Sequence, residues 1–184
     1  IARNGNHGIT FELSSNNVLS GNITSNNVSG ITLRDYSSNN TFTDNVISDS
    51  IYGLTISANA NNNILTGNTI SNNYRGLRLM GANNKLYHNN FVNNSIQTLV
   101  YNGGGNLFYE EYPTGGNYWS DYAGVDQKSG PNQDQPGPDK IGDTPYTFTG
   151  GQDRYPFMEK DGWKVPANRP PISSNHNQYK SDVQ

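Results

Sequence analysis

The residues best suited to chemistry form an acidic stretch between residues 121 and 143. Its carboxylates are spaced among Gly, Pro and Asn with almost nothing apolar, so this loop cannot fold by burying hydrophobic surface. Hard oxygen ligands on a flexible loop are what Ca²⁺ uses, and a bound ion would supply the missing ordering energy. The spacing is not that of an EF-hand, and a solvated acidic loop is an equal alternative. The candidate ligands of a structural Ca²⁺ are Asp126, Asp134, Asp139 and Asp143.

A second set of side chains has the chemistry of carbohydrate binding. Twelve of the twenty aromatic residues fall within residues 106–184, and aromatic faces stack on sugar rings. The competing interpretation of Trp119 is a residue that closes the end of a repeat structure, and the sequence favours that interpretation. The weak candidates for carbohydrate binding are Trp119, Tyr118, Arg75 and Arg78.

These side chains need a scaffold, and an asparagine-rich phrase that recurs four times indicates what it is. The recurring asparagines are separated by 23, 23 and 21 residues. A period this short is typical of a solenoid in which each repeat forms one coil. We expect their amides to stack in a structural ladder rather than to form a row of ligands. The ladder residues are Asn22, Asn45, Asn68 and Asn89.

Each repeat alternates apolar and polar residues over three short stretches, the pattern of β-strands. Leu19, Phe42, Leu65 and Leu86 take one equivalent position. A glycine opens the third stretch of every coil, at residues 8, 30, 53 and 76, where we expect no space for a side chain. The sequence therefore predicts an all-β solenoid of stacked coils with three parallel sheets.

Composition changes after residue 105, and so does the predicted organisation. Residues 1–105 are expected to form the coils, and residues 106–165 an irregular aromatic C-terminal cap that carries the acidic loop. Such a segment suits the exposed end of a solenoid, which must be covered. Residues 166–184 lack a hydrophobic pattern and are expected to be a linker.

Overall composition excludes several functions. The chain of 184 residues has a net charge of −3 and no basic cluster, so nucleic acid is not an expected partner. No apolar run approaches the roughly 18 residues of a membrane span, so we expect no membrane insertion. The absence of cysteine excludes disulfides and thiolate metal sites.

Two sets of motifs resemble a known family. The coil phrases NVSGITL at 27–33 and NYRGLRL at 73–79 are similar to NosD-like repeats. The blocks GNYWSDY at 116–122, IGDTPY at 141–146 and DRYPFM at 153–158 resemble the end of such helices in surface proteins of methanogenic archaea. The resemblance covers about residues 8–160.

The resemblance implies a right-handed, single-stranded parallel β-helix of the pectin-lyase-like type, at the cell surface or outside the cell. It also implies that the chain is part of a longer multidomain surface protein. NosD itself is tied to copper-site maturation, but copper prefers soft or imidazole ligands. The chain has no cysteine, two methionines and three scattered histidines, so we expect no copper.

Two functions remain open at this point. The first is a structural or carbohydrate-binding module whose partners are a polysaccharide or neighbouring surface-protein subunits. The second is a polysaccharide hydrolase or lyase whose active site lies on a face of the β-helix or on further N-terminal coils. A glycosidase needs two carboxylates flanking the bond, and no acidic pair lines up across neighbouring coils in this sequence. We therefore favour the module.

Overall fold

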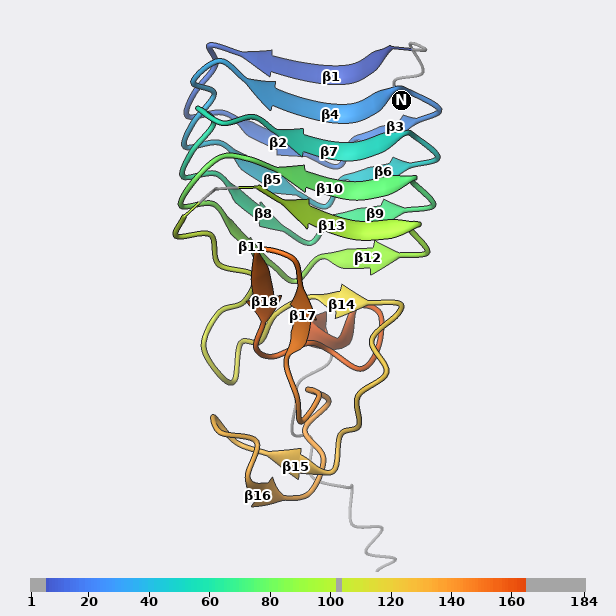
Figure 1. Ribbon diagram of the computed structural model, residues 1–184, viewed down its shortest axis with the longest axis vertical. Coiled ribbons are helices and arrows are strands. Elements are labelled where there is room, and N and C mark those ends of the chain that lie inside the picture. The colour runs from blue at the N-terminus through green and yellow to red at the C-terminus, as the bar shows by residue number, and fades with distance from the viewer. Residues whose placement is uncertain (1–5, 102–103, 165–184) are drawn as a thin grey trace, which may run out of the picture.

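The computed structural model describes residues 6–101 and 104–164. The chain winds into a stack of coils, each contributing one strand to each of three parallel sheets (Figure 1). The parallel β-helix is thus confirmed, and its right-handed sense stays a prediction. The linker expected at residues 166–184 lies outside the described residues and also stays a prediction.

The first sheet has the longest strands of the three, with five or six residues each. Its five strands, in spatial order, are β1 (His7–Glu12), β4 (Ser29–Arg34), β7 (Tyr52–Ile56), β10 (Arg75–Leu79) and β13 (Ile96–Val100).

The second and third sheets complete each coil with strands of two or three residues. The second sheet holds β2 (Val18–Ser20), β5 (Thr41–Thr43), β8 (Ile64–Thr66) and β11 (Lys85–Tyr87). The third holds β3 (Ile23–Ser25), β6 (Val46–Ser48), β9 (Thr69–Ser71), β12 (Asn90–Val92) and β14 (Tyr118–Trp119).

The C-terminal segment adds only small elements. They are the antiparallel pair β15 (Lys128–Ser129) and β16 (Gln135–Pro136), the antiparallel pair β17 (Tyr146–Phe148) and β18 (Gly151–Asp153), and the 3₁₀ turn η1 (Gly162–Lys164).

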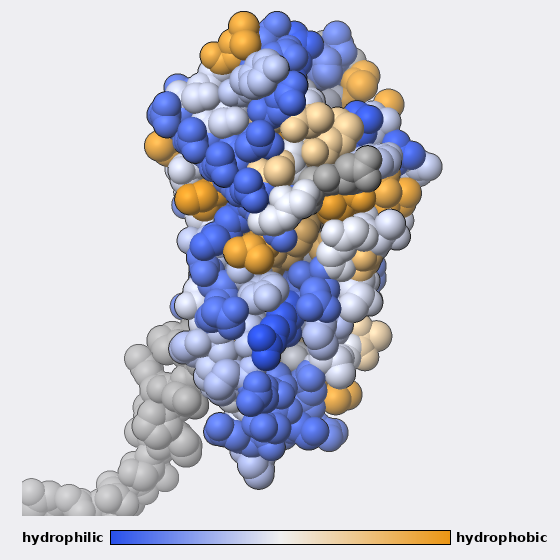
Figure 2. Space-filling view, turned by 60° about the vertical axis from the view of Figure 1, so that its left-hand side comes forward, coloured by the Kyte–Doolittle hydropathy of each residue, from blue (hydrophilic) through white to orange (hydrophobic). Residues whose placement is uncertain are grey.

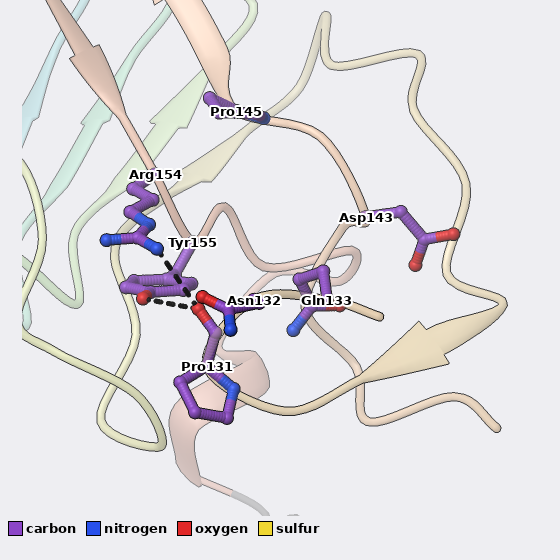
Figure 3. A pocket seen from close by; sticks show the side chains of 7 residues that line it. All are labelled: Pro131, Asn132, Gln133, Asp143, Pro145, Arg154 and Tyr155. Atoms are coloured by element: carbon purple, nitrogen blue, oxygen red, sulfur yellow. Dashed lines mark hydrogen bonds between the residues drawn. The ribbon is translucent and has the colours of Figure 1, made fainter. Parts of the chain in front are cut away.

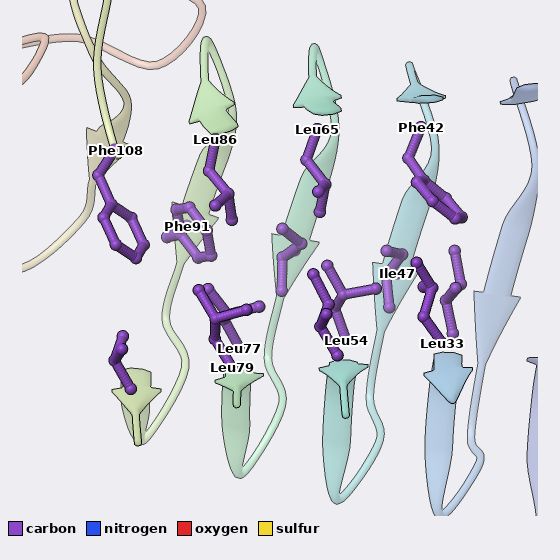
Figure 4. Close-up of a cluster of buried hydrophobic side chains, with 14 of the residues drawn as sticks. Leu33, Phe42, Ile47, Leu54, Leu65, Leu77, Leu79, Leu86, Phe91 and Phe108 are labelled. Atoms are coloured by element: carbon purple, nitrogen blue, oxygen red, sulfur yellow. The ribbon is translucent and has the colours of Figure 1, made fainter. Parts of the chain in front are cut away.

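The strand register places equivalent residues of successive repeats directly over one another. In the second sheet Leu19, Phe42, Leu65 and Leu86 are aligned, and the last three are at most 1% exposed. Figure 4 shows these side chains pointing into the interior, where they meet apolar residues of the first and third sheets. Full burial of one such side chain contributes about 1.5–3 kcal/mol, so a thin apolar seam stabilises each coil.

Polar ladders run along all three corners of the coil, not only along the one that the repeats indicate. In each ladder the side chain of one coil accepts the backbone N–H of the equivalent residue in the preceding coil. Asn45 shows the full pattern, because its backbone N and its Nδ2 both donate to Oδ1 of Asn68, over 3.0 Å and 2.9 Å. The first ladder comprises Asn17, Asn40, Asn63, Asn84 and Asn106; the second Asn22, Asn45, Asn68, Asn89 and Asn117; the third Asn27, Ser50, Asn73 and Asn94.

All four asparagines expected to form a ladder lie in the second one. Asn45, Asn68 and Asn89 are at most 1% exposed. Asn22 is half-buried, because it belongs to the first described coil and bonds only to the coil that follows it.

Each corner also needs a residue with a left-handed backbone. In thirteen coil corners the residue just before the ladder residue has a positive φ, as at Asn72, where φ is 56°. Asn, Asp and Gly tolerate this conformation better than other residues, which explains why so many ladder residues follow an Asn, Asp or Gly.

The glycines at the second position of strands β1, β4, β7 and β10 lie where neighbouring coils approach closely. A Cβ atom at Gly53 would lie 2.7 Å from the carbonyl oxygen of Gly76 and 2.8 Å from Nδ2 of Asn73. No side chain fits between those atoms, which agrees with the expectation from the sequence.

The coil geometry continues past residue 105, where the sequence analysis places its end. Leu107 forms a parallel bridge with Lys85, and β14 pairs with β12 in the third sheet. The fifth coil therefore extends to Trp119. In Figure 1, β17 and β18 lie next to β14 at this end of the stack, with β15 and β16 farther along the long axis.

The coil register can be tested at two neighbouring asparagines. We expect Asn68→Leu to lower the free energy of unfolding by about 1–3 kcal/mol, since it leaves buried amide groups without partners. The matched control is Asn72→Gly, because Asn72 is exposed and its positive φ suits glycine. Chemical denaturation monitored by circular dichroism measures both changes. Equal losses of stability in the two variants would contradict the register.

Candidate functional site

The outward face of the first sheet collects the side chains with binding chemistry. Ile31 and Leu33 of β4 point into the core, so the residue between them points outward. The register aligns Thr10, Thr32, Thr55, Arg78 and Leu99 in this outward row. It aligns His7, Ser29, Tyr52, Arg75 and Ile96 in a second row. The second row shares the face of the first, because Ser29 bonds to Thr32 and Tyr52 contacts Arg78.

Two arginines and one tyrosine form the centre of this face. The guanidinium carbon of Arg75 lies 5.4 Å from the ring centroid of Tyr52, and that of Arg78 lies 5.8 Å from it. Nη1 of Arg75 also donates to the hydroxyl of Tyr52 over 2.9 Å. The sequence analysis names both arginines as carbohydrate-binding candidates, and one ring of the adjacent strand brings them together.

Two further tyrosines flank the pair. The Tyr74 ring centroid lies 5.3 Å from the guanidinium carbon of Arg75, and that of Tyr101 lies 5.7 Å from the guanidinium carbon of Arg78. Both tyrosines are exposed, at 53% and 41%. We call Tyr52, Tyr74, Arg75, Arg78 and Tyr101 the Arg–Tyr patch.

Hydroxyl groups continue the same face from the patch toward β4. The hydroxyl of Thr32 donates to that of Ser29 over 2.8 Å, and the hydroxyl of Ser29 donates to that of Thr55 over 3.5 Å. These residues are only 3–7% exposed although they point outward. The result is a row of linked hydroxyls beside two cations.

The other two carbohydrate candidates do not lie on this face. Trp119 is 1% exposed and stacks between Phe91 and Tyr146, with centroid distances of 4.3 Å and 4.5 Å. It offers no ring face to a sugar, because both faces pack against aromatic residues at the end of the stack. Tyr118 is half-buried against a separate small cluster that includes Tyr155 and Phe157.

Sequence reasoning missed the three tyrosines of the patch, although the repeat period carries a signal for one of them. Tyr52 precedes Arg75 by 23 residues, the interval of the repeat, which places the two side by side on adjacent strands. Tyr74 and Tyr101 lie at strand ends, where no interval in the sequence predicts their direction.

The four carboxylates proposed for Ca²⁺ do not converge. Asp126 accepts hydrogen bonds from the backbone N–H of Asp139 and Lys140, over 3.0 Å and 2.8 Å. Asp143 accepts from two other backbone amides, and Asp134 is exposed. Within residues 6–101 and 104–164, no three His, Cys, Asp or Glu side chains are grouped to hold a metal ion.

Asp139 is the carboxylate of the loop with the most hydrogen-bond partners inside the loop. It is 4% exposed and accepts hydrogen bonds from Gly130 N, Gln133 Nε2 and Ile141 N, over 3.3 Å, 3.1 Å and 3.0 Å. Bonds between a carboxylate and N–H donors are stronger than neutral ones. These hydrogen bonds help to order the loop, and the bound Ca²⁺ stays a prediction.

A small pocket of about 180 Å³ lies beside this loop, lined in part by Asn132, Gln133, Asp143 and Arg154 (Figure 3). Nη2 of Arg154 and the hydroxyl of Tyr155 both donate to the carbonyl oxygen of Pro131, over 3.3 Å and 2.9 Å. Ligand pockets usually measure about 300–1,000 Å³. This pocket is smaller than that range, so the Arg–Tyr patch is the stronger candidate site.

The origin of order in the acidic loop is testable with one pair of variants. We expect Asp126→Asn to lower the free energy of unfolding by about 1.5–3 kcal/mol, because it weakens two bonds from backbone amides to a charged acceptor. Asp134→Asn is the matched control and should change little. Thermal unfolding in Ca²⁺ and in chelator should give the same difference. A Ca²⁺-dependent rise in the melting temperature that Asp126→Asn abolishes would instead establish the ion.

The second ladder ends on a buried carboxylate, Asp153. Its Oδ2 accepts from the backbone N of Asn117 over 2.6 Å, from Asn117 Nδ2 over 3.3 Å and from Trp119 Nε1 over 2.9 Å. Its Oδ1 accepts from the backbone N of Tyr155 over 3.0 Å. All four bonds come from N–H donors, which favour the ionised carboxylate because that form only accepts hydrogen bonds.

Asp153 also titrates far from its ordinary range. Complete burial raises the pKa of Asp153 from 3.8 to about 7, and the hydrogen bonds from Trp119, Asn117 and Tyr155 act in the opposite direction. The folded state therefore holds this proton more tightly than the unfolded chain. Its contribution to stability must fall as pH rises from about 4 to about 7.

Comparing the wild type with Asp153→Asn isolates that titration. We expect the wild type to lose stability relative to the variant between pH 4 and pH 7, by about 1.4 kcal/mol for each unit of pKa difference. His88, whose pKa burial lowers, titrates in both proteins and cancels. Urea unfolding at several pH values measures the difference. A wild-type advantage that grows with pH would show that the native carboxylate has a low pKa.

The fold and this face define the chain as a parallel β-helix protein. The family model of the periplasmic copper-binding protein (NosD) matches residues 1–124. The chain belongs to the NosD family. Comparisons with curated proteins and with solved structures find no significant match.

The described residues do not form a copper site. His7 lies in β1 and His88 follows β11, three coils away along the stack. Nε2 of His88 lies 2.7 Å from the carbonyl oxygen of Thr114, and its ring stacks on Trp163 at 5.2 Å. The chain has no cysteine, so the soft and imidazole donors that copper prefers are not assembled in this part of the protein.

None of the helices in the described ranges is long and apolar enough to cross a membrane.

Proposed function

We propose that this protein is an extracellular β-helix module that binds carbohydrate on the outward face of its first sheet. The observation that carries the proposal is that one ring, that of Tyr52, contacts the guanidinium groups of both Arg75 and Arg78, at 5.4 Å and 5.8 Å. The description of the family as periplasmic supports a location outside the cytoplasm.

The patch combines two kinds of contact that a sugar needs. Exposed tyrosine rings offer apolar faces for the C–H side of a pyranose. The guanidinium groups present planar N–H donors. Tyr74 and Tyr101 stand on either side of this set, so a glycan chain lying on β10 would contact both.

Binding without cleavage fits this face better than hydrolysis. Both glycosidase mechanisms need two carboxyl groups, about 5–10 Å apart, on opposite sides of the scissile bond. On the outward rows of the first sheet the described carboxylate is Glu12, and Arg34 forms an ion pair with it. The face therefore offers cations, rings and hydroxyls, but not a pair of carboxylates.

We infer that this module is part of a longer surface protein, in which the stacked coils act as a rigid spacer. Its partners would be a polysaccharide or neighbouring surface-protein subunits. In the view of Figure 2, hydrophobic residues on the coils are scattered singly among hydrophilic ones, which agrees with a coil surface that stays in contact with water.

A glycan array with the intact chain tests the proposal. We expect Tyr52→Ala to weaken binding to any hit about tenfold, a loss of about 1.4 kcal/mol, because both arginines lose their ring contact. Tyr87→Ala, on the second sheet, is the matched control and should bind normally. The hits should show no new reducing ends after incubation. An array without hits would overturn the proposal, and cleavage of a hit would establish an enzyme.

A further inference from the structure

We propose that the ligand of the Arg–Tyr patch is an acidic polysaccharide, whose carboxylate or sulfate groups are bound by Arg75 and Arg78. This inference rests on the proposed carbohydrate-binding function and names the charge class of the glycan. It follows from how the two cations are held, from what surrounds them and from their spacing.

The positive charges of Arg75 and Arg78 give the first reason to expect an anionic ligand. Elsewhere in the described chain, Arg34 pairs with Glu12, Lys85 with Glu110 and Lys164 with Asp161. Neither Arg75 nor Arg78 takes part in any ion pair among the described residues. Two neighbouring guanidinium groups on one strand repel each other, so an external anion would stabilise the pair.

The reduced hydration of the Arg75 guanidinium gives the second reason. Nε of Arg75 is shielded from water and has no hydrogen-bond partner within the described residues. The rings of Tyr52 and Tyr74 both lie against this guanidinium, at 5.4 Å and 5.3 Å. A cation whose hydration is reduced in this way binds an anion more strongly than a fully solvated one. Arginine can also bind a carboxylate or sulfate with two parallel hydrogen bonds.

The spacing of the two arginines indicates the length of the ligand. Arg75 and Arg78 are three residues apart on β10, so their backbones are separated by about 10 Å along the strand. That length corresponds to roughly two sugars of an extended chain, with the Tyr52 ring between the two cations. A glycan with an anionic group at such intervals would engage both arginines and stack one sugar on the ring.

The surroundings favour a glycan over a nucleic acid. The net charge of the chain is −3, and the basic patch holds only two arginines, whereas nucleic-acid binding needs many phosphate contacts. The linked hydroxyls of Ser29, Thr32 and Thr55 beside the patch match a polymer that carries hydroxyl groups between its charges.

The test is affinity electrophoresis of the intact chain in gels containing polygalacturonate, dextran sulfate or unmodified dextran. We expect an acidic polymer to bind at least tenfold more tightly than dextran, and the affinity to fall as salt rises. The polygalacturonate and dextran sulfate gels distinguish a carboxylate ligand from a sulfate ligand.

Variants assign the effect to the patch. Arg75→Gln with Arg78→Gln should weaken binding of the acidic polymer at least tenfold and remove most of the salt dependence. The control Arg154→Gln with Lys160→Gln removes the same charge from the C-terminal segment and should stay within twofold of the wild type. Arg78→Gln alone provides a second test if the double variant melts early, because the Arg78 guanidinium contacts the rings of Tyr52 and Tyr101 and forms no ion pair among the described residues.

The outcomes separate this inference from the proposed function. Equal binding of dextran and the acidic polymers, or unchanged binding by the double glutamine variant, would overturn the acidic ligand while leaving carbohydrate binding in place. Failure to bind any of the glycans, or any on the array, would overturn both. Tighter binding of a single-stranded oligonucleotide of matched charge would show that the patch recognises a different polymer.

Discussion

The rest of this structure depends on one requirement: each corner of each coil must give its buried backbone N–H a hydrogen-bond partner. A buried amide without a partner costs about 1–3 kcal/mol, and a coil has three corners. An asparagine of the following coil meets the need, as Asn68 does for Asn45, because its Oδ1 accepts the N–H while its Nδ2 donates onward to Oδ1 of Asn89. The repeat length, the left-handed residue before each ladder residue and the parallel register all follow from keeping these side chains aligned.

The second ladder ends where Asn117 donates to Asp153, and the same carboxylate accepts from Trp119 Nε1. Because Asp153 lies on β18, this contact ties the C-terminal segment to the last coil. Trp119 then fills the space between Phe91 and Tyr146. One buried carboxylate, with its raised pKa, thus links the polar order of the coils to the aromatic packing beyond them.

Because the corners and the interior are constrained in this way, variation is left to the outward faces of the sheets. The outward row of the first sheet runs from Thr10 through Thr32 and Thr55 and then changes to Arg78. That change adds a charge without any cost to the core. Membership of the NosD family defines the scaffold, but the donors that copper prefers are not assembled in the described residues. Function on such a scaffold has to be argued from the particular side chains of one face.

The sequence by itself determined the coil. The spacing of Asn22, Asn45, Asn68 and Asn89, with the apolar alternation between them, was sufficient to predict parallel stacked strands, because a solenoid repeats the same local contacts in every coil. The tertiary structure decided what local repetition cannot encode. It buried Trp119, separated the carboxylates of the acidic loop and placed Tyr52 between two arginines. The loop and Trp119 lie in the non-repeating segment, where contacts join residues far apart in sequence. The direction of a surface ring depends on neighbours in other coils, which no pattern within one repeat specifies.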